Sequence, residues 1–141
     1  MRVSERTDEL RILLAEDSED DVVTFRYSMR KAGVHGDLTI LNSGEKVVDY
    51  VKGQRLYADR SVFPMPSLIF LDGQLHREPS TALLRWIRSH PVAKKIPVIV
   101  LTGNQDPRVA KDAEACGAIA CIPKPMTQEH WTRLRKLLNR S

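Results

Sequence analysis

The sequence predicts an α/β fold built on a single parallel sheet, and three observations support this prediction. Five short apolar segments alternate along the 141 residues with five segments whose apolar residues recur every three or four positions. The segment 67–71 is apolar without alternation, as expected for a strand that helices cover on both faces. Polar or charged residues directly follow several of the apolar segments, where the ligand crevice of such a sheet lies.

Each expected strand is a run of about five residues that is mainly apolar. The first is a short apolar run, the second alternates weakly, and the last three are rich in Ile, Leu, Val or Ala. The strands are expected at 11–15, 37–41, 67–71, 97–101 and 118–122.

The expected helices fill the intervals between the strands and have recognisable ends. Ser18 is a suitable N-cap for the first helix, which should run to about residue 31 and stop at Gly33. Either Asn42 or Ser43 could cap the second helix, which should end near residue 53 before a long connection. The remaining helices are marked by apolar residues within 83–87, 109–116 and 131–138.

The composition is that of an ordinary globular domain, with 42% hydrophobic and 28% charged residues. No apolar run approaches the roughly 20 residues that span a bilayer, and the polar N-terminus lacks a signal-peptide core. A cytoplasmic protein without a membrane partner is therefore expected.

The net charge of +4 is dispersed, apart from a C-terminal cluster that is better explained as a solvated helix face than as a nucleic-acid surface. Cys116 and Cys121 are too few for a disulfide framework or a metal cage, so core positions are expected.

Chemically useful side chains follow four of the expected strands. Glu16 and Asp17 follow the first strand, Asp72 the third, Thr102 the fourth and Lys124 the fifth. Carboxylates brought together in this way repel each other unless a cation lies among them. Mg²⁺ binds a few carboxylate oxygens and keeps several waters, so the pattern predicts a magnesium site beside Asp72.

This set of groups suits phosphoryl transfer to a carboxylate. Asp72 is the candidate nucleophile and would form an aspartyl phosphate. Mg²⁺ would neutralise the phosphoryl oxygens, and Lys124 and Thr102 would bind those that remain. Each residue taken singly could be a turn, cap or loop residue. Their occurrence in order at four strand ends favours the chemical interpretation.

Four segments together resemble the receiver domain of two-component response regulators, over about residues 10–138. They are ILLAEDS at 12–18, LIFLD at 68–72, VIVLTG at 98–103 and IPKP at 122–125. The resemblance implies a flavodoxin-like, doubly wound sheet of five parallel strands in the order 2-1-3-4-5, flanked by five helices. It also implies that residues 1–141 form a single receiver domain, with its core at about 10–139 and no output domain.

The same resemblance implies a role for each site residue. Asp17 would bind Mg²⁺ directly and Glu16 through water, and Asp72 and the backbone carbonyl of Gln74 would be the other protein ligands. Asp72 would be the phosphorylated residue, and the chain would be a signalling phosphoacceptor rather than an enzyme acting on other substrates.

Two further residues complete the site that the family implies. Thr102 would be the hydroxyl that follows the phosphoryl group, and Lys124 would contact the phosphate. The peptide bond between Lys124 and Pro125 is often cis in the family.

Partners are implied at the level of the family. The long connection between residues 53 and 66 is similar to that of stand-alone regulators of bacterial phytochrome kinases, and another stand-alone phosphorelay adaptor is the alternative. The expected phosphoryl donor is a histidine kinase, of phytochrome type or another, or a phosphotransfer protein. The expected output is contact with a downstream protein rather than with nucleic acid, and homodimers are common in the family.

Three positions depart from the family pattern. Cys121 stands where many receivers have Tyr or Phe as the rotating partner of the switch threonine, so the signal is expected to come from a loop shift instead. His76 stands where proline is common, and Gly73-Gln74 replaces the usual residues after the acceptor. These changes are expected to affect the lifetime of the phosphorylated state and not its formation.

Three other functions compete with this interpretation. A Mg²⁺-dependent phosphohydrolase usually needs a second Asp two residues after its nucleophile, and Gln74 stands there. A binding module that is never phosphorylated would be expected to have lost the acidic pair or Lys124. A basic nucleic-acid adaptor would bind DNA in a salt-dependent way.

Overall fold

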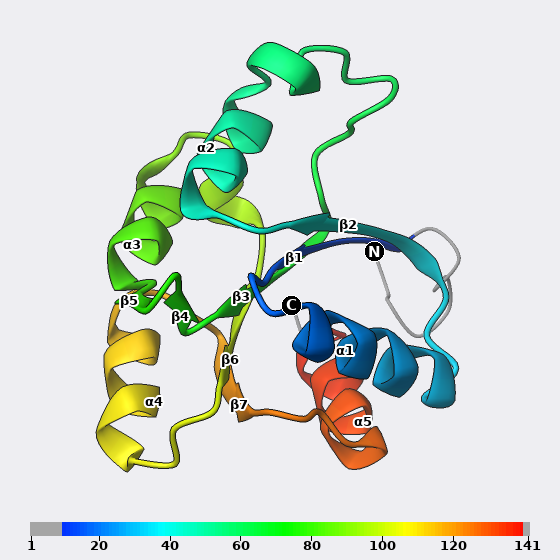
Figure 1. The fold of residues 1–141 in the computed structure, drawn as a ribbon, viewed down its shortest axis with the longest axis vertical. Coiled ribbons are helices and arrows are strands. Elements are labelled where there is room, and N and C mark those ends of the chain that lie inside the picture. Colours follow the sequence, from blue (N-terminus) through cyan, green and yellow to red (C-terminus); the bar gives the residue numbers. More distant parts are fainter. Residues whose placement is uncertain (1–9, 140–141) are drawn as a thin grey trace.

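The structure, a computed structural model, describes residues 10–139 and contains a sheet of five parallel strands (Figure 1). The strands are β1 (Leu10–Ala15), β2 (Gly36–Leu41), β3 (Leu68–Asp72), β6 (Val98–Thr102) and β7 (Ala120–Pro123). They lie in the order β2-β1-β3-β6-β7, which is 2-1-3-4-5 when only the strands of this sheet are counted. The predicted flavodoxin-like fold is confirmed.

Helices cover both faces of the sheet (Figure 1). On one face lie α1 (Glu19–Lys31) and α5 (Gln128–Leu138), and on the other lie α2 (Gly44–Lys52), α3 (Thr81–Ser89) and α4 (Pro107–Ala115). The rings of Phe25 and Trp131 pack against the sheet residue Phe70, with ring centroids 4.9 and 5.4 Å away. None of the helices within residues 10–139 is long and apolar enough to cross a membrane.

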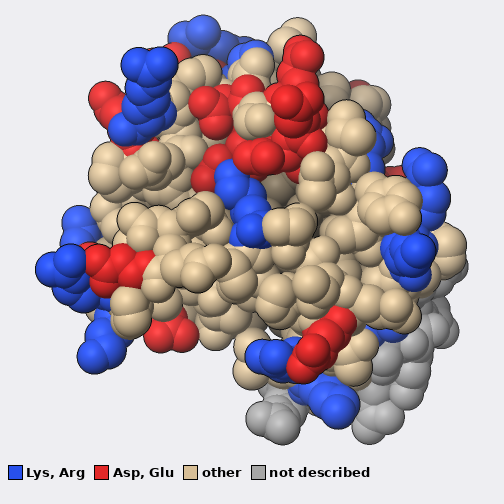
Figure 2. Space-filling view, turned by 60° about the horizontal axis from the view of Figure 1, so that its bottom comes forward, with Lys and Arg blue, Asp and Glu red and all other residues tan. Residues whose placement is uncertain are grey.

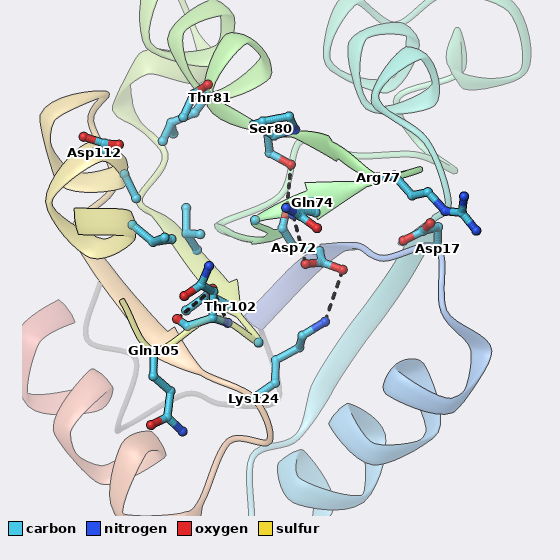
Figure 3. Close-up of a pocket in the computed structure, with 18 residues that line it drawn as sticks. Asp17, Asp72, Gln74, Arg77, Ser80, Thr81, Thr102, Gln105, Asp112 and Lys124 are labelled. Atoms are coloured by element: carbon cyan, nitrogen blue, oxygen red, sulfur yellow. Dashed lines mark hydrogen bonds and ion pairs between the residues drawn. The ribbon is translucent and has the colours of Figure 1, made fainter. Parts of the chain in front are cut away.

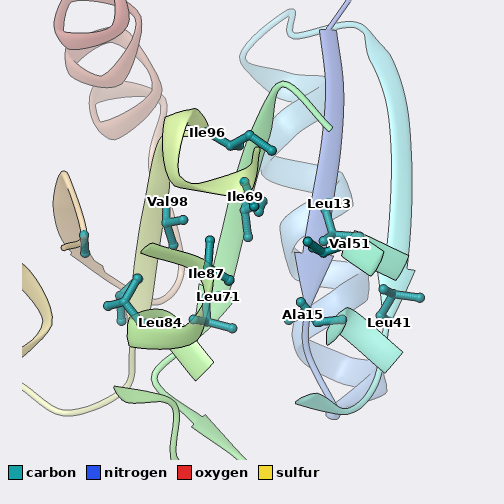
Figure 4. Packing of buried hydrophobic residues seen from close by; sticks show 14 of the residues in the cluster. Leu13, Ala15, Leu41, Val51, Ile69, Leu71, Leu84, Ile87, Ile96 and Val98 are labelled. Atoms are coloured by element: carbon teal, nitrogen blue, oxygen red, sulfur yellow. The ribbon is translucent and has the colours of Figure 1, made fainter. Parts of the chain in front are cut away.

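The second apolar core lies between the sheet and helices α2, α3 and α4, and Figure 4 shows its packing. Leu84 and Ile87 of α3 lie beside Ile69 and Leu71 of β3, and all four side chains are buried. Because β3 is buried on both faces, its run of apolar residues needs no alternation.

The helix starts agree with the sequence, and they show which of two candidate residues caps α2. The Ser18 side chain accepts a hydrogen bond from the backbone of Asp21, as predicted, and Ser43 rather than Asn42 caps α2 by accepting from the Lys46 N–H. Each cap satisfies a donor that the first helical turn leaves without a partner.

The last strand begins two residues later than the 118–122 predicted from the apolar run. The Ala118 N–H donates to the carbonyl of Ala113 at 3.1 Å, so residue 118 still belongs to the turn that ends α4. Gly117 makes this turn at φ 110°, and a Cβ there would lie 2.4 Å from Cγ of Arg88. The other four strands of the sheet differ from prediction by one residue at one end or at both ends.

Three short elements were not predicted. A two-residue hairpin joins β4 (Gln74–Leu75) to β5 (Glu78–Pro79) directly after Asp72, and its turn residues His76 and Arg77 have φ of 51° and 68°. Two 3-10 helices occur at Arg55–Tyr57 and Ala93–Lys95. Glycine and asparagine signals usually mark such a turn, and this hairpin has neither.

The long connection between α2 and β3 is anchored by Arg60. Its guanidinium donates to the carbonyls of Tyr50 at 2.7 Å, Val51 at 2.6 Å and Phe63 at 3.3 Å. The Tyr50 hydroxyl in turn donates to the carbonyl of Pro64 at 2.8 Å. Arg60 therefore satisfies carbonyl groups at the C-terminal end of α2 and ties the connection to that helix.

Replacing Arg60 with Met tests this anchor, because Met keeps an apolar stem and removes the donors. We expect the free energy of unfolding to fall by about 1–3 kcal/mol, since two helix-end carbonyls lose a charged partner. Urea denaturation measures the change. Arg55→Met is the matched control, because the Arg55 side chain is 83% exposed and its nearest carboxylate is 3.9 Å away. Equal losses in the two variants would contradict the anchoring role.

Candidate functional site

The side chains predicted to act together meet at the carboxyl edge of the sheet. A groove of about 800 Å³ is lined by Asp17, Asp72, Gln74, Thr102 and Lys124, among others. Figure 3 shows Lys124 reaching toward Asp72, with Thr102 on one side and the β4–β5 hairpin on the other. These residues come from four strand ends, as expected when parallel strands point the same way.

Glu16 lies just outside this groove. It lines an adjoining pocket together with Asp21 and Lys124. Lys124 lines both cavities, and Glu16 lies within 4.8 Å of the Asp72 carboxylate.

The Lys124 ammonium lies among three carboxylates. Its Nζ is 2.7 Å from Asp21 Oδ2, 3.2 Å from Asp72 Oδ2 and 3.4 Å from Glu16 Oε1. The Lys124 N–H donates to the carbonyl of Thr102 at 2.8 Å, and the bond from Lys124 to Pro125 is cis. Burial disfavours the ammonium, but the surrounding carboxylates outweigh it and raise the pKa of Lys124 above its usual range.

Glu16 is the most deeply buried acid of the cluster, with its residue 3% exposed. Burial raises the pKa of Glu16 to about 8, and the neighbouring Asp72 adds to this effect. The charge of Lys124 and a 3.3 Å hydrogen bond from the Ser18 N–H oppose it. Burial therefore favours the protonated form of Glu16 when no cation is bound.

Asp72 is held by the chain that follows it. Its Oδ1 accepts a hydrogen bond from the Gln74 N–H at 3.1 Å, and its backbone carbonyl accepts one from the Ser80 hydroxyl. Oδ2 faces Lys124, and the residue is 6% exposed. The Asp72 carboxylate is thus buried in the groove, with its orientation determined by Gln74 and Lys124.

The Thr102 hydroxyl is bound to the loop after β6 rather than to Asp72. It accepts from the Asn104 N–H at 2.9 Å and lies 3.2 Å from the Asn104 carbonyl. Any contact of Thr102 with a new group on Asp72 therefore changes its bonds to this loop.

Asp21, to which the sequence analysis gave no role, joins the buried carboxylates, and Asp17 lies apart from them. The carboxylates that lie within 4.8 Å of one another belong to Glu16, Asp21 and Asp72, and Asp17 is outside this trio. Asp17 Oδ2 instead accepts from the His76 N–H at 3.0 Å, on the hairpin side of the groove (Figure 3). In the sequence Asp21 is one of several acidic residues at a helix start. Its position three residues after the Ser18 cap was the sequence feature that could have distinguished it from the others.

The oxygen donors fit a hard divalent cation. Asp17, Asp72 and Gln74 line the same groove, and they offer two carboxylates and a backbone carbonyl. Pro79, which pairs with Gln74, has no N–H that could occupy that carbonyl. The trio of Glu16, Asp21 and Asp72 already surrounds an ammonium, so Mg²⁺ fits better on the Asp17 side.

The family description "Response regulator receiver domain" matches residues 12–136. The chain belongs to the response-regulator receiver family. Response regulator Rcp1 of Synechocystis is 33% identical over 101 residues, which are 70% of this chain and 67% of Rcp1. This receiver is therefore a module of two-component signalling, whose partner is a histidine kinase or a phosphotransfer protein.

Solved receivers have the same fold. Response regulator RPA3017, described in red light signaling of R. palustris, is 25% identical with a TM-score of 0.80, over 92% of this chain and 91% of that one. The phosphorylated cyanobacterial phytochrome response regulator RcpA is 22% identical with a TM-score of 0.73, over 92% and 91%. A Mn²⁺-bound form of Rcp1 is 24% identical with a TM-score of 0.71, over 89% of each chain.

The receiver has a half-buried cysteine in the strand beside Thr102. Cys121 lies in β7 and packs against the core between the sheet and helices α2, α3 and α4, and burial raises the pKa of its thiol. Cys116, at the end of α4, packs against the same core. Both cysteines are half-buried and lie near the core, as expected from the sequence.

The protonation of Glu16 predicts how the stability of the metal-free receiver depends on pH. The folded-state pKa of about 8 lies above the ordinary value of 4.5, so the folded state binds more protons between these values. The resulting stabilisation is complete below pH 4.5 and is lost as pH rises to about 8. Urea denaturation in EDTA from pH 5.5 to about 8 measures it.

Glu16→Gln should remove this part of the pH dependence. Glu19→Gln, in the first turn of α1, should keep it, because Glu19 is exposed and lies outside the buried trio. If Glu16→Gln retains the full slope, the proton does not reside on Glu16.

Proposed function

We propose that this receiver accepts a phosphoryl group on Asp72 and passes the signal to a protein partner. The observation that carries the proposal is the position of Asp72 Oδ2. It lies in a groove open to a donor, 3.2 Å from an ammonium that can bind phosphoryl oxygens. The donor is a histidine kinase or a phosphotransfer protein.

The transfer needs little beyond positioning and charge. Oδ2 of Asp72 attacks the phosphorus as the donor's bond to phosphorus breaks, and the donor leaves with that electron pair. Lys124 binds one oxygen of the transferred group, and the Thr102 hydroxyl binds another. Bound Mg²⁺, held by Asp17, Asp72 and the carbonyl of Gln74 with Glu16 acting through water, supplies positive charge against the phosphoryl oxygens.

The output follows from the bonds of Thr102. When its hydroxyl moves to the phosphoryl group, it leaves Asn104, so the segment between β6 and α4 must rearrange. Cys121 cannot reorient as a large aromatic ring would, and the loop shift is therefore the signal. A two-state loop biased by charge at Asp72 is an ordinary switching element.

The partners are proposed from the relatives. RcpA is a phytochrome response regulator and RPA3017 belongs to red light signalling, which favours a phytochrome-type kinase as the donor. We propose that residues 10–139 act as one receiver domain in the cytoplasm, with a downstream protein or a second copy of the chain on the α4–β7 side. Another phosphorelay adaptor role is the alternative.

Intact-protein mass after incubation with acetyl phosphate and Mg²⁺ tests the proposal. We expect one phosphoryl group on the wild type, none on Asp72→Asn, and none when EDTA removes the metal. Asp49→Asn on α2 is the matched control and should be phosphorylated like the wild type. An unmodified wild type, or an adduct that persists in Asp72→Asn, would refute the assignment of the acceptor.

A further inference from the structure

Asp21 lies at a defined place in the first turn of α1. Its N–H donates to the Ser18 side chain at 3.3 Å, so the helix cap holds the backbone from which its carboxylate reaches Lys124. The side chain is 40% exposed, compared with 9% for Asp72 and 2% for Glu16. Asp21 is therefore the only solvated member of the trio of carboxylates described above.

The contact between Lys124 and Asp21 is the shortest of the three that the ammonium makes. At 2.7 Å it has the length of a strong charge-assisted hydrogen bond, whereas the contacts to Asp72 and Glu16 are 3.2 and 3.4 Å. An ammonium has three donors on a flexible stem, so holding one donor orients the other two.

Figure 2 shows how charged side chains are distributed over one face of the molecule. Acidic side chains gather at one place on this face, and a basic side chain lies at the edge of the group. If Asp21 did not hold Lys124, the ammonium would pair fully with the two buried carboxylates. The Asp72 oxygen that must attack phosphorus would then accept the strongest hydrogen bond from that ammonium.

From this geometry we infer that Asp21 is a positioning residue for phosphorylation, and this inference rests on the proposed function. Its carboxylate holds the Lys124 ammonium on the α1 side of Asp72. The other two donors lie against Glu16 and Asp72, so Asp72 Oδ2 accepts only a longer contact from the ammonium. Phosphoryl oxygens added to Asp72 can then take over these two donors. Asp21 acts through Lys124 and does not touch the phosphoryl group.

The test compares Asp21→Asn with Asp20→Asn in the full chain. Asp20 is the preceding residue on the same helix turn, and its carboxylate is not one of the three around Lys124. Both variants lose one negative charge near the groove, so a general effect of charge on an anionic donor appears in both. Asp21→Glu restores a carboxylate and serves as the rescue variant.

Two quantities are measured for each protein. The first is the rate of Asp72 phosphorylation by acetyl phosphate with Mg²⁺, followed by intact mass. The second is the ¹H–¹⁵N resonance of the Lys124 ammonium in the metal-free protein, which reports its partners directly. We expect Asp21→Asn to slow phosphorylation about three- to tenfold relative to Asp20→Asn and to shift or lose the Lys124 resonance. Asp21→Glu should recover most of the rate.

The outcomes separate this inference from the proposed function. A wild type that accepts no phosphoryl group overturns the function itself. A wild type that is phosphorylated, with Asp21→Asn matching Asp20→Asn in both rate and Lys124 resonance, overturns the role of Asp21 alone. A slow Asp21→Asn with an unchanged Lys124 resonance also overturns it, because the effect would then not pass through Lys124.

Discussion

The ammonium of Lys124 makes the interactions on which the acidic site depends, because it lies among carboxylates from three separate segments. Glu16 and Asp72 are buried at the ends of neighbouring strands, and two ionised carboxylates there would repel each other without it. The sheet order brings Lys124 to this place, since β7 lies beside β6 and β6 beside β3. The crossovers of the doubly wound fold thus bring together charges that are 52 and 108 residues apart in the sequence.

The groove around Asp72 also depends on the chain that follows the acceptor strand. The β4–β5 hairpin turns back at once, and the backbone N–H of His76 holds Asp17 on its side of the groove. The His76 ring is in turn bound to the Asn42 carbonyl at 2.7 Å, before α2. Proline, which is common in the family at this position, could not donate that N–H. The Asp17 side of the groove therefore depends on the His76 N–H and on the contact of its ring with Asn42.

Most of the fold could be predicted because its signals are local. Apolar periodicity and caps such as Ser18 depend on near neighbours, and the predicted acceptor and lysine follow their strands directly. The environments of Asp17 and Asp21 could not be predicted, since both depend on side-chain directions at a helix start and on contacts across the sheet. The hairpin was missed because His76-Arg77 lacks the glycine or asparagine that usually marks a turn with positive φ.

A structure of the protein with Mg²⁺ and a beryllofluoride mimic of the phosphoryl group is the most direct test of Asp72 as the acceptor. We expect the mimic on the Asp72 carboxylate, with Lys124 Nζ and the Thr102 hydroxyl in contact with its fluorines. We also expect the cation on Asp17, Asp72 and the carbonyl of Gln74, and a shifted loop after β6 because Thr102 has left Asn104. A mimic bound away from Asp72, or one that Lys124 does not contact, would contradict this mechanism.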